Sequence, residues 1–169
     1  MPDTLTALDA FNARPPDEAE RALLACCACR AFAAKVAALR PYRGLGELLA
    51  AADAAVRDLE WSGVLEALSA HPRIGERAAG TGAEAAWSRQ EQSGVDDASR
   101  AALAEGNRAY EERFGHVYLV CATGLDGAEL LARLTSRLRN DEATERDVVR
   151  AELAAITRVR LRKLIEEGR

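Results

Sequence analysis

The sequence predicts an all-α fold, a single-domain bundle of about eight or nine helices spanning residues 1–169. Alanine, the strongest helix former, fills 36 of the 169 positions, and leucine and arginine are also frequent. Residues that favour strands are scarce, with only three tyrosines and three phenylalanines. A domain of about 150 residues buries about 68–70% of the surface of its unfolded chain, so we expect a substantial hydrophobic core.

Prolines and an acidic residue delimit the predicted helices of the N-terminal part. A short helix near Leu5–Phe11 is followed by a break at Arg14–Pro16. Asp17 is then predicted to cap a second helix. The helical spacing of apolar residues continues beyond Cys27, so one helix is expected to run on until Pro41 ends it, with an inward face of Leu23, Leu24, Phe32, Val36 and Leu39.

Apolar spacing and capping residues predict helices along the rest of the chain. Two of the predicted helices run from Gly44 to Leu59 and from a cap at Ser62 towards His71. A third contains Trp87–Gln92, and a fourth runs from Asp96 or Asp97 to Gly115. The last two run from Gly127 to Asn140 and from Ala143 to Glu167. The run Val117–Cys121 is strand-like but has no partner strand, so we predict a buried extended or helical segment. Gly75–Gly82, which contains Glu76 and Arg77, is predicted to be a loop able to order over a ligand.

Charge and hydropathy exclude two classes of partner. The formal charge is −4, and the sequence has no basic block or aromatic-interleaved basic stripe of the kind that nucleic-acid binding needs. No stretch approaches the roughly 18 apolar residues of a membrane span, and the N-terminal residues do not resemble a secretion signal. We therefore expect a cytoplasmic protein that contacts neither nucleic acid nor membrane.

Four cysteines stand at Cys26, Cys27, Cys29 and Cys121. Adjacent thiols on one helix are poorly placed for disulfides, and a cytoplasmic chain keeps them reduced. The simplest interpretation is that they are small buried residues. A zinc site made of Cys26, Cys29, Cys121 and a histidine is the alternative, although it lacks the paired CxxC spacing of structural zinc sites.

Two segments carry the residues expected to do chemistry. In His71–Arg77, Pro72 stops the preceding helix and leaves an imidazole at its end. In Trp87–Gln92, the side chains of Ser88, Glu91 and Gln92 project from one helix face because they stand at i, i+3 and i+4. Together they form an acid/base set without a metal, and two histidines are too few for a three-histidine metal site. The alternative for His71 is a helix C-terminal cap.

Arg160 is the third informative residue. Leu153, Ile156, Arg160 and Leu164 recur at the spacing of a core-facing stripe, whereas Arg158 and Arg162 point elsewhere and are expected to be solvated. A guanidinium in an apolar stripe requires an anion. That anion is either a buried Glu or Asp, or a substrate carboxylate or ureido oxygen.

Nearly the whole chain, from about Leu8 to Leu164, resembles the OHCU decarboxylase family, which acts on 2-oxo-4-hydroxy-4-carboxy-5-ureidoimidazoline. The residues that carry the resemblance are Cys26-Cys27, Ala70–Gly75, Trp87–Gln92, Asn107, Tyr110, Arg113–Ala122, Glu152 and Arg160-Leu161. The chain departs from the family at Ala28-Cys29 and Phe32, where relatives tend to carry a serine and a tryptophan, which puts the pocket wall in doubt more than the chemistry.

The resemblance implies an all-α homodimer that releases CO2 without a cofactor to give (S)-allantoin. It places the catalytic histidine on His71 and its acidic partner on Glu91, and it assigns substrate binding to Ser88, Gln92 and Arg160. We add Pro72, Leu119 and Val120 to the predicted substrate-binding set. His116 is interpreted as structural, and Trp61 and Trp87 as packing residues, with Trp87 near enough to line the site.

Two other functions stay open at this point. One is a helical interaction module that has lost catalysis and binds an enzyme of purine breakdown. Loss of His71, Glu91 or Arg160 would favour this function, and all three residues are present. The other is decarboxylation or hydrolysis of a different ureido acid within the same fold.

Overall fold

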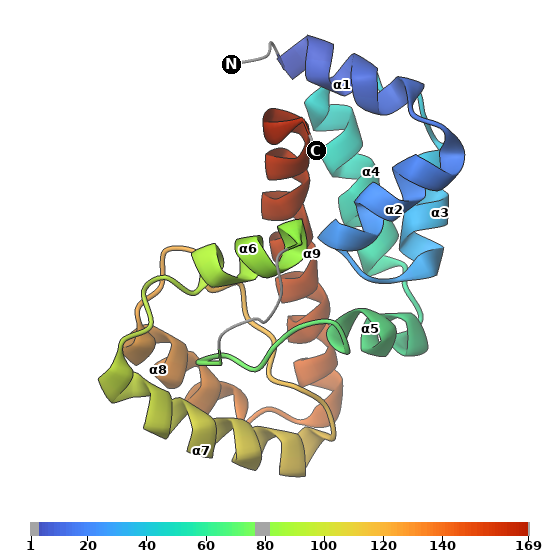
Figure 1. Cartoon of the computed structure of the whole chain (residues 1–169). Coiled ribbons are helices and arrows are strands. Elements are labelled where there is room, and N and C mark those ends of the chain that lie inside the picture. Colours follow the sequence, from blue (N-terminus) through green and yellow to red (C-terminus); the bar gives the residue numbers. More distant parts are fainter. Residues whose placement is uncertain (1–3, 77–81, 169) are drawn as a thin grey trace. The chain divides into compact units, whose positions relative to one another are not determined.

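The computed structural model describes residues 4–76 and 82–168 and contains nine helices and no strand within those ranges. The helices are α1 (Thr4–Ala13), α2 (Pro16–Cys26), α3 (Arg30–Ala38), α4 (Leu45–Arg57), α5 (Trp61–Leu68), α6 (Ala83–Glu91), α7 (Asp97–Phe114), α8 (Gly127–Arg137) and α9 (Glu142–Glu167). The predicted fold class is confirmed (Figure 1). None of these helices combines the length and the apolar character that a membrane crossing requires.

The chain forms two compact units. The first contains the residues up to Ala67 and those from Leu153 onward, and the second contains Leu68 to Glu152. The helix α9 therefore contributes residues to both. The expectation of a single domain over residues 1–169 stays a prediction.

In the first unit, α2 packs on α3, α3 packs on α4, and α1 contacts α4. The guanidinium of Arg40 donates to the carbonyl oxygens of Phe11 and Arg14 at 2.9 Å each, and so satisfies acceptors where α1 ends. Fully buried apolar side chains make the core of this unit: Leu8, Phe11, Leu23, Phe32, Val36, Leu48, Val56, Leu153 and Leu161.

The prediction of one helix from Asp17 to Pro41 is wrong. The backbone is extended at Cys27 and Cys29, with φ of −151° and −127°, and α2 and α3 are separate helices. In a continuous helix, residues 27 and 29 face opposite sides, so both thiols cannot point into one core. The break allows both to be buried, at 1% and 0% exposure.

Two predicted caps are also wrong. The N-cap of α2 is Pro15 and its first residue is Pro16, so Asp17 lies in the first turn and makes no side-chain cap bond. There its charge still faces the positive end of the helix. The helix α5 begins at Trp61, and the carbonyl of Glu60 accepts from the amide of Val64 at 3.1 Å, so Ser62 lies inside the helix.

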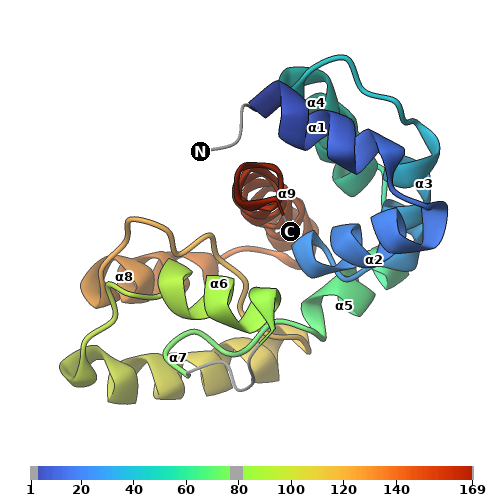
Figure 2. The same ribbon diagram turned by 45° about the horizontal axis from the view of Figure 1, so that its top comes forward.

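In the second unit, α7 runs alongside α8, which both views show (Figures 1 and 2). The side chain of Asp96 accepts from Ser99 N and caps α7, while Gly115 ends the helix with a φ of +78°, as predicted. Asp126 and Glu129 form a reciprocal capping box at the start of α8. The core of this unit comprises Ile74, Leu103, Tyr110, Tyr118, Val120, Ala122, Leu130 and Leu134.

The run Val117–Cys121 lies outside any helix or strand, with Tyr118, Leu119 and Val120 buried. This confirms the prediction of a buried segment that is not part of a sheet.

Candidate functional site

The predicted histidine follows the end of a helix. The helix α5 ends at Leu68, and the amide of His71 donates to the carbonyl of Leu68 at 3.0 Å. His71 and Pro72 are both half-buried. The helix stops before this pair as the proline predicts, because Pro72 has no amide proton and disfavours helical backbone at His71.

Side chains from two other segments hold the residues that follow His71. The carbonyl oxygen of the Gln92 side chain accepts from the amide of Gly75 at 2.9 Å, and the side-chain amide of Asn107 donates to the carbonyl of Ile74 at 2.8 Å. Gly75 has a φ of +93°, which favours glycine. Gln92, which the sequence assigns to the substrate, therefore also fixes the His71–Glu76 segment.

The helix α6 presents a buried face containing Trp87, Ser88 and Glu91. Their exposed fractions are 2%, 4% and 9%, so the hydroxyl and the carboxylate are withdrawn from water on the same side of the helix. Gln92 is the C-cap, and its amide donates to the carbonyl of Ser88. The predicted grouping of Ser88 with Glu91 on one face is confirmed.

Cys121 comes after the predicted binding residues Leu119 and Val120, and its thiol is half-buried. Burial raises the pKa of the Cys121 thiol, and the negative charges of Glu152 and Glu91 raise it further. The pairing of Glu91 with His71 stays a prediction.

Arg160 is buried in α9, with 2% of its surface exposed, whereas Arg158 and Arg162 are exposed. This is the arrangement that the apolar spacing predicts. Arg160 belongs to the first unit, where its Nη1 lies 3.5 Å from the carbonyl oxygen of Ala25. Its predicted role towards a substrate stays a prediction.

A cavity of about 300 Å³ lies in the second unit beside the end of the His71–Glu76 segment. It is lined by Gly75, Glu76, Arg89, Gln92, Ser93, Val95 and Arg100. Of the predicted site residues, Gln92 contributes to this lining. The remainder of the predicted loop to Gly82, including Arg77, lies outside the described residues up to residue 81.

The cysteines and the second histidine take structural positions. Cys26, Cys27 and Cys29 are buried and form no disulfide, as predicted, and Cys121 is half-buried. The ring of His116 packs edge-on against Tyr110, with 5.5 Å between ring centroids, and its Nδ1 lies 3.1 Å from the carbonyl oxygen of Val117. In residues 4–76 and 82–168, His, Cys, Asp and Glu side chains form no cluster of three that is able to hold a metal ion.

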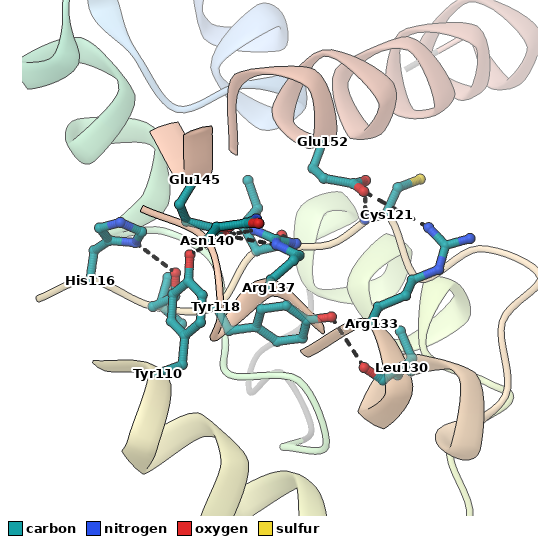
Figure 3. A network of polar contacts seen from close by, with 12 residues as sticks. Tyr110, His116, Tyr118, Cys121, Leu130, Arg133, Arg137, Asn140, Glu145 and Glu152 are labelled. Atoms are coloured by element: carbon teal, nitrogen blue, oxygen red, sulfur yellow. Dashed lines mark hydrogen bonds and ion pairs between the residues drawn. The ribbon is translucent and has the colours of Figure 1, made fainter. Parts of the chain in front are cut away.

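Sequence reasoning missed a buried ion pair in the second unit, between Arg137 at the end of α8 and Glu145 near the start of α9 (Figure 3). Arg137 Nε donates to Glu145 Oε1 at 2.7 Å, and the hydroxyl of Tyr110 donates to the same oxygen at 2.6 Å. The helical spacing of α8 could have indicated that Arg137 is buried, because Arg137 continues the buried stripe of Leu130 and Leu134.

Comparison with known proteins gives consistent matches. The family model of OHCU decarboxylase matches residues 12–162. The chain is 32% identical over 143 residues to the 2-oxo-4-hydroxy-4-carboxy-5-ureidoimidazoline decarboxylase of Amia calva, covering 82% of each protein. It is 30% identical over 148 residues to the uric acid degradation bifunctional protein TTL of Arabidopsis thaliana, of which it spans 46%.

A solved structure is also similar. A crystal structure of OHCU decarboxylase in the presence of (S)-allantoin superposes with a TM-score of 0.72 at 27% sequence identity. The match covers 85% of this chain and 96% of that one.

Proposed function

Because the chain belongs to the OHCU decarboxylase family, we propose that it decarboxylates 2-oxo-4-hydroxy-4-carboxy-5-ureidoimidazoline to (S)-allantoin in urate degradation. The observation that carries the proposal is the family match over residues 12–162, a span that includes His71, Glu91 and Arg160. Burial of Glu91 and Arg160 supports it, since active sites are places where charged groups are withdrawn from water.

The chemistry of the substrate fits this inventory of residues. Decarboxylation breaks a C–C bond, and the electron pair left behind needs a sink. A conjugated imidazoline ring next to the carboxylate supplies that sink, so the protein has to provide placement and proton control. We expect the reaction to need no cofactor.

His71 and Glu91 are the proposed acid/base pair. The imidazole exchanges a hydrogen bond or a proton with the ring hydroxyl, and the carboxylate of Glu91 orients the imidazole and stabilises its charged form. Protonation of the carbanion on one face then yields the S configuration. Fixing of the His71–Glu76 segment by Gln92 and Asn107 supports this role, because proton transfer depends on a well-held donor.

The remaining predicted residues bind the substrate in this proposal. Arg160 binds the carboxylate or the ureido oxygen, and Ser88 and Gln92 donate or accept hydrogen bonds. Pro72, Leu119 and Val120 complete the contacts. We further propose that the protein is cytoplasmic and that its active form is a homodimer. Light scattering of the purified chain measures the oligomeric state directly.

The test is an assay in which urate is oxidised and the product hydrolysed in place, with circular dichroism recording the allantoin that forms. We expect the chain to produce (S)-allantoin faster than the uncatalysed reaction, which gives both enantiomers. Racemic allantoin at the uncatalysed rate contradicts the proposal. Omission of the oxidation step is the control, since the proposed substrate then does not form and no (S)-allantoin should appear.

A further inference from the structure

The segment Tyr118–Cys121, which lies outside any helix or strand, is held at successive points by side chains from α8 and α9. Arg137 Nη1 donates to the carbonyl oxygen of Leu119 at 2.6 Å. The carboxylate of Glu152 accepts from the amide of Cys121 at 3.0 Å. Figure 3 shows Glu152 above Cys121, with Arg137 and the Tyr118 ring below. The two bonds therefore lie on either side of Val120 in the chain.

These two bonds orient both polar groups of Val120. The peptide bonds of this segment are trans, since the cis bond of the described chain precedes Pro41. The C=O and N–H of a trans peptide point in opposite directions. Fixing the carbonyl of Leu119 therefore directs the amide of Val120, and fixing the amide of Cys121 directs the carbonyl of Val120.

Arg137 itself is held rigidly. Its Nε donates to Glu145 Oε1 at 2.7 Å, and Glu145 is 0% exposed. Glu145 also accepts from the hydroxyl of Tyr110 at 2.6 Å and from the side-chain amide of Asn140 at 2.9 Å. The guanidinium carbon of Arg137 lies 4.8 Å from the centroid of the Tyr118 ring. The planar guanidinium of Arg137 has several N–H groups, so it binds the carboxylate of Glu145 and the carbonyl of Leu119 simultaneously.

Arg137 keeps its positive charge, and Tyr110 keeps its proton. Burial by itself lowers the pKa of Arg137, but the hydrogen bond and the charge of Glu145 raise it above its ordinary value. Burial and the hydrogen bond to Glu145 both raise the pKa of Tyr110, which keeps its proton for that bond.

We propose that Arg137, held by Glu145, and Glu152 are positioning residues that orient the backbone of Leu119 and Val120 for substrate binding. The inference rests on the proposed function, in which Leu119 and Val120 contact the substrate. Arg137 and Glu152 act through the backbone. A peptide segment outside any helix or sheet lacks the hydrogen-bond ladder that fixes regular structure, so side chains supply that restraint here.

The first test replaces Arg137 by lysine in the full chain. Lysine keeps the positive charge, but its single ammonium group lacks the fork that binds Glu145 and the Leu119 carbonyl together. We expect KM to rise about 10- to 100-fold, since small displacements of binding groups cost about that much. A purely structural role lowers the folded fraction and the apparent kcat and leaves KM unchanged, and that result overturns the proposal. Arg139→Lys, an exposed arginine two residues further on, is the matched control.

The second variant, Glu152→Ala, removes the other bond and leaves the Arg137–Glu145 pair in place. We expect a rise in KM of the same order, with Glu112→Ala on the exposed side of α7 as the control. If Arg137→Lys fails to fold, this variant decides, and a wild-type KM for it overturns the proposal.

Amide hydrogen exchange separates this inference from the proposed function. We expect exchange at residues 119–121 to accelerate at least tenfold in either variant while the centre of α7 keeps its wild-type rate. If the wild-type chain produces no (S)-allantoin, the proposed function fails, and the positioning of the segment is then judged by exchange alone. Unchanged exchange at residues 119–121 overturns it.

Discussion

Glu91, Arg137, Glu145 and Arg160 are charged residues buried in the described part of the chain. Removing a charge from water costs several kcal/mol unless partners compensate it, so each of these residues needs a physical reason. Arg137 and Glu145 compensate one another inside the second unit. Arg160 lies 3.5 Å from the carbonyl oxygen of Ala25. Because we propose roles in catalysis and substrate binding for Glu91 and Arg160, we expect substitution at these two positions to affect activity more than stability.

His71→Ala and Glu91→Ala are expected to reduce the rate of (S)-allantoin formation by about 10²- to 10⁴-fold, the usual contribution of general acid–base catalysis. Helix content and melting temperature should change little, because neither side chain belongs to the apolar core. Circular dichroism gives both the turnover and the melting curve. His116→Ala is the matched control, expected to lower the melting temperature through lost packing on Tyr110 and to leave kcat unchanged. A wild-type rate for His71→Ala would show that the assigned acid/base pair is wrong.

Arg160→Met is expected to raise the Michaelis constant about 10- to 150-fold, which corresponds to losing a charge-assisted hydrogen bond of about 1.5–3 kcal/mol. Methionine keeps the length and the helix propensity, so the fold should survive. Arg158→Met and Arg162→Met, both at exposed positions of α9, should change little. Steady-state kinetics and melting temperatures of the three variants separate binding from stability. A lower melting temperature with an unaltered Michaelis constant would assign Arg160 to structure alone.

At the scale of the elements, the loop containing His71 depends on one backbone conformation. Gly75 adopts a φ of +93° directly after the Ile74–Gly75 peptide group, whose carbonyl is bound by Asn107 and whose amide is bound by Gln92. A residue with a Cβ is strained in this region whatever space surrounds it. The contact itself is ordinary, since a Cβ added there would lie 3.5 Å from Leu103.

Gly75→Ala is expected to lower the free energy of unfolding by about 1–3 kcal/mol through backbone strain. Gly46→Ala provides a comparison of opposite sign. Gly46 lies in the first turn of α4, and a Cβ added there meets no atom within 4 Å. Alanine at this position should therefore stabilise the chain by about 0.5 kcal/mol, because it restricts the unfolded state. Urea unfolding of both variants measures the two effects, and equal stabilities would refute the argument from φ.

The helices that the sequence predicted correctly are those whose ends carry a strong local signal. Asp96 and Gly115 delimit α7 because a side-chain acceptor and a left-handed residue are local requirements. The break between α2 and α3 has no such signal. Cys27 and Cys29 are neither glycine nor proline, and the break follows from burying both thiols, which only the tertiary structure determines.

The same limit applies to the candidate site. Spacing along one helix correctly placed Arg160 on a buried face and grouped Ser88 with Glu91. Arg137 was missed although it follows Leu130 and Leu134 at helical spacing, and its partner Glu145 lies on another helix. Periodicity shows which face of a helix is buried, but it does not show which distant residue meets it. The bond between Gln92 and Gly75 was beyond sequence reasoning for the same reason.

At the scale of the whole molecule, buried neutral acids link stability to pH. Burial raises the pKa of the Cys27 thiol to about 12 from an ordinary value of 9.0, and the charge of Cys29 adds to the effect. Burial likewise raises the pKa of Tyr118 from 10.0 to about 12. Each group stays protonated in the folded chain at a pH where the unfolded chain releases its proton. The stability that each contributes is therefore complete below its unfolded pKa and is lost as the pH rises towards 12.

The free energy of unfolding is accordingly expected to fall above pH 9, by up to about 1.4 kcal/mol per pH unit for each such group. Cys27→Ala should lose about 1 kcal/mol less than the wild-type chain between pH 9 and pH 10, because the contribution of Tyr118 is the same in both proteins. Urea unfolding at pH 8, 9, 10 and 11 measures both curves. Parallel curves for the two proteins would show that Cys27 does not link folding to pH.

The division of α9 between the two units governs the order in which the chain can fold during synthesis. Residues 68–152 are continuous, so every segment of the second unit has left the ribosome once Glu152 emerges. The first unit takes its last segment from Leu153 onward, which includes the buried residues Leu153 and Leu161, so its apolar core is incomplete until then. Uncovered apolar surface is what chaperones bind. Nascent residues 4–67 should therefore depend on chaperones for the whole time that the second unit is being translated.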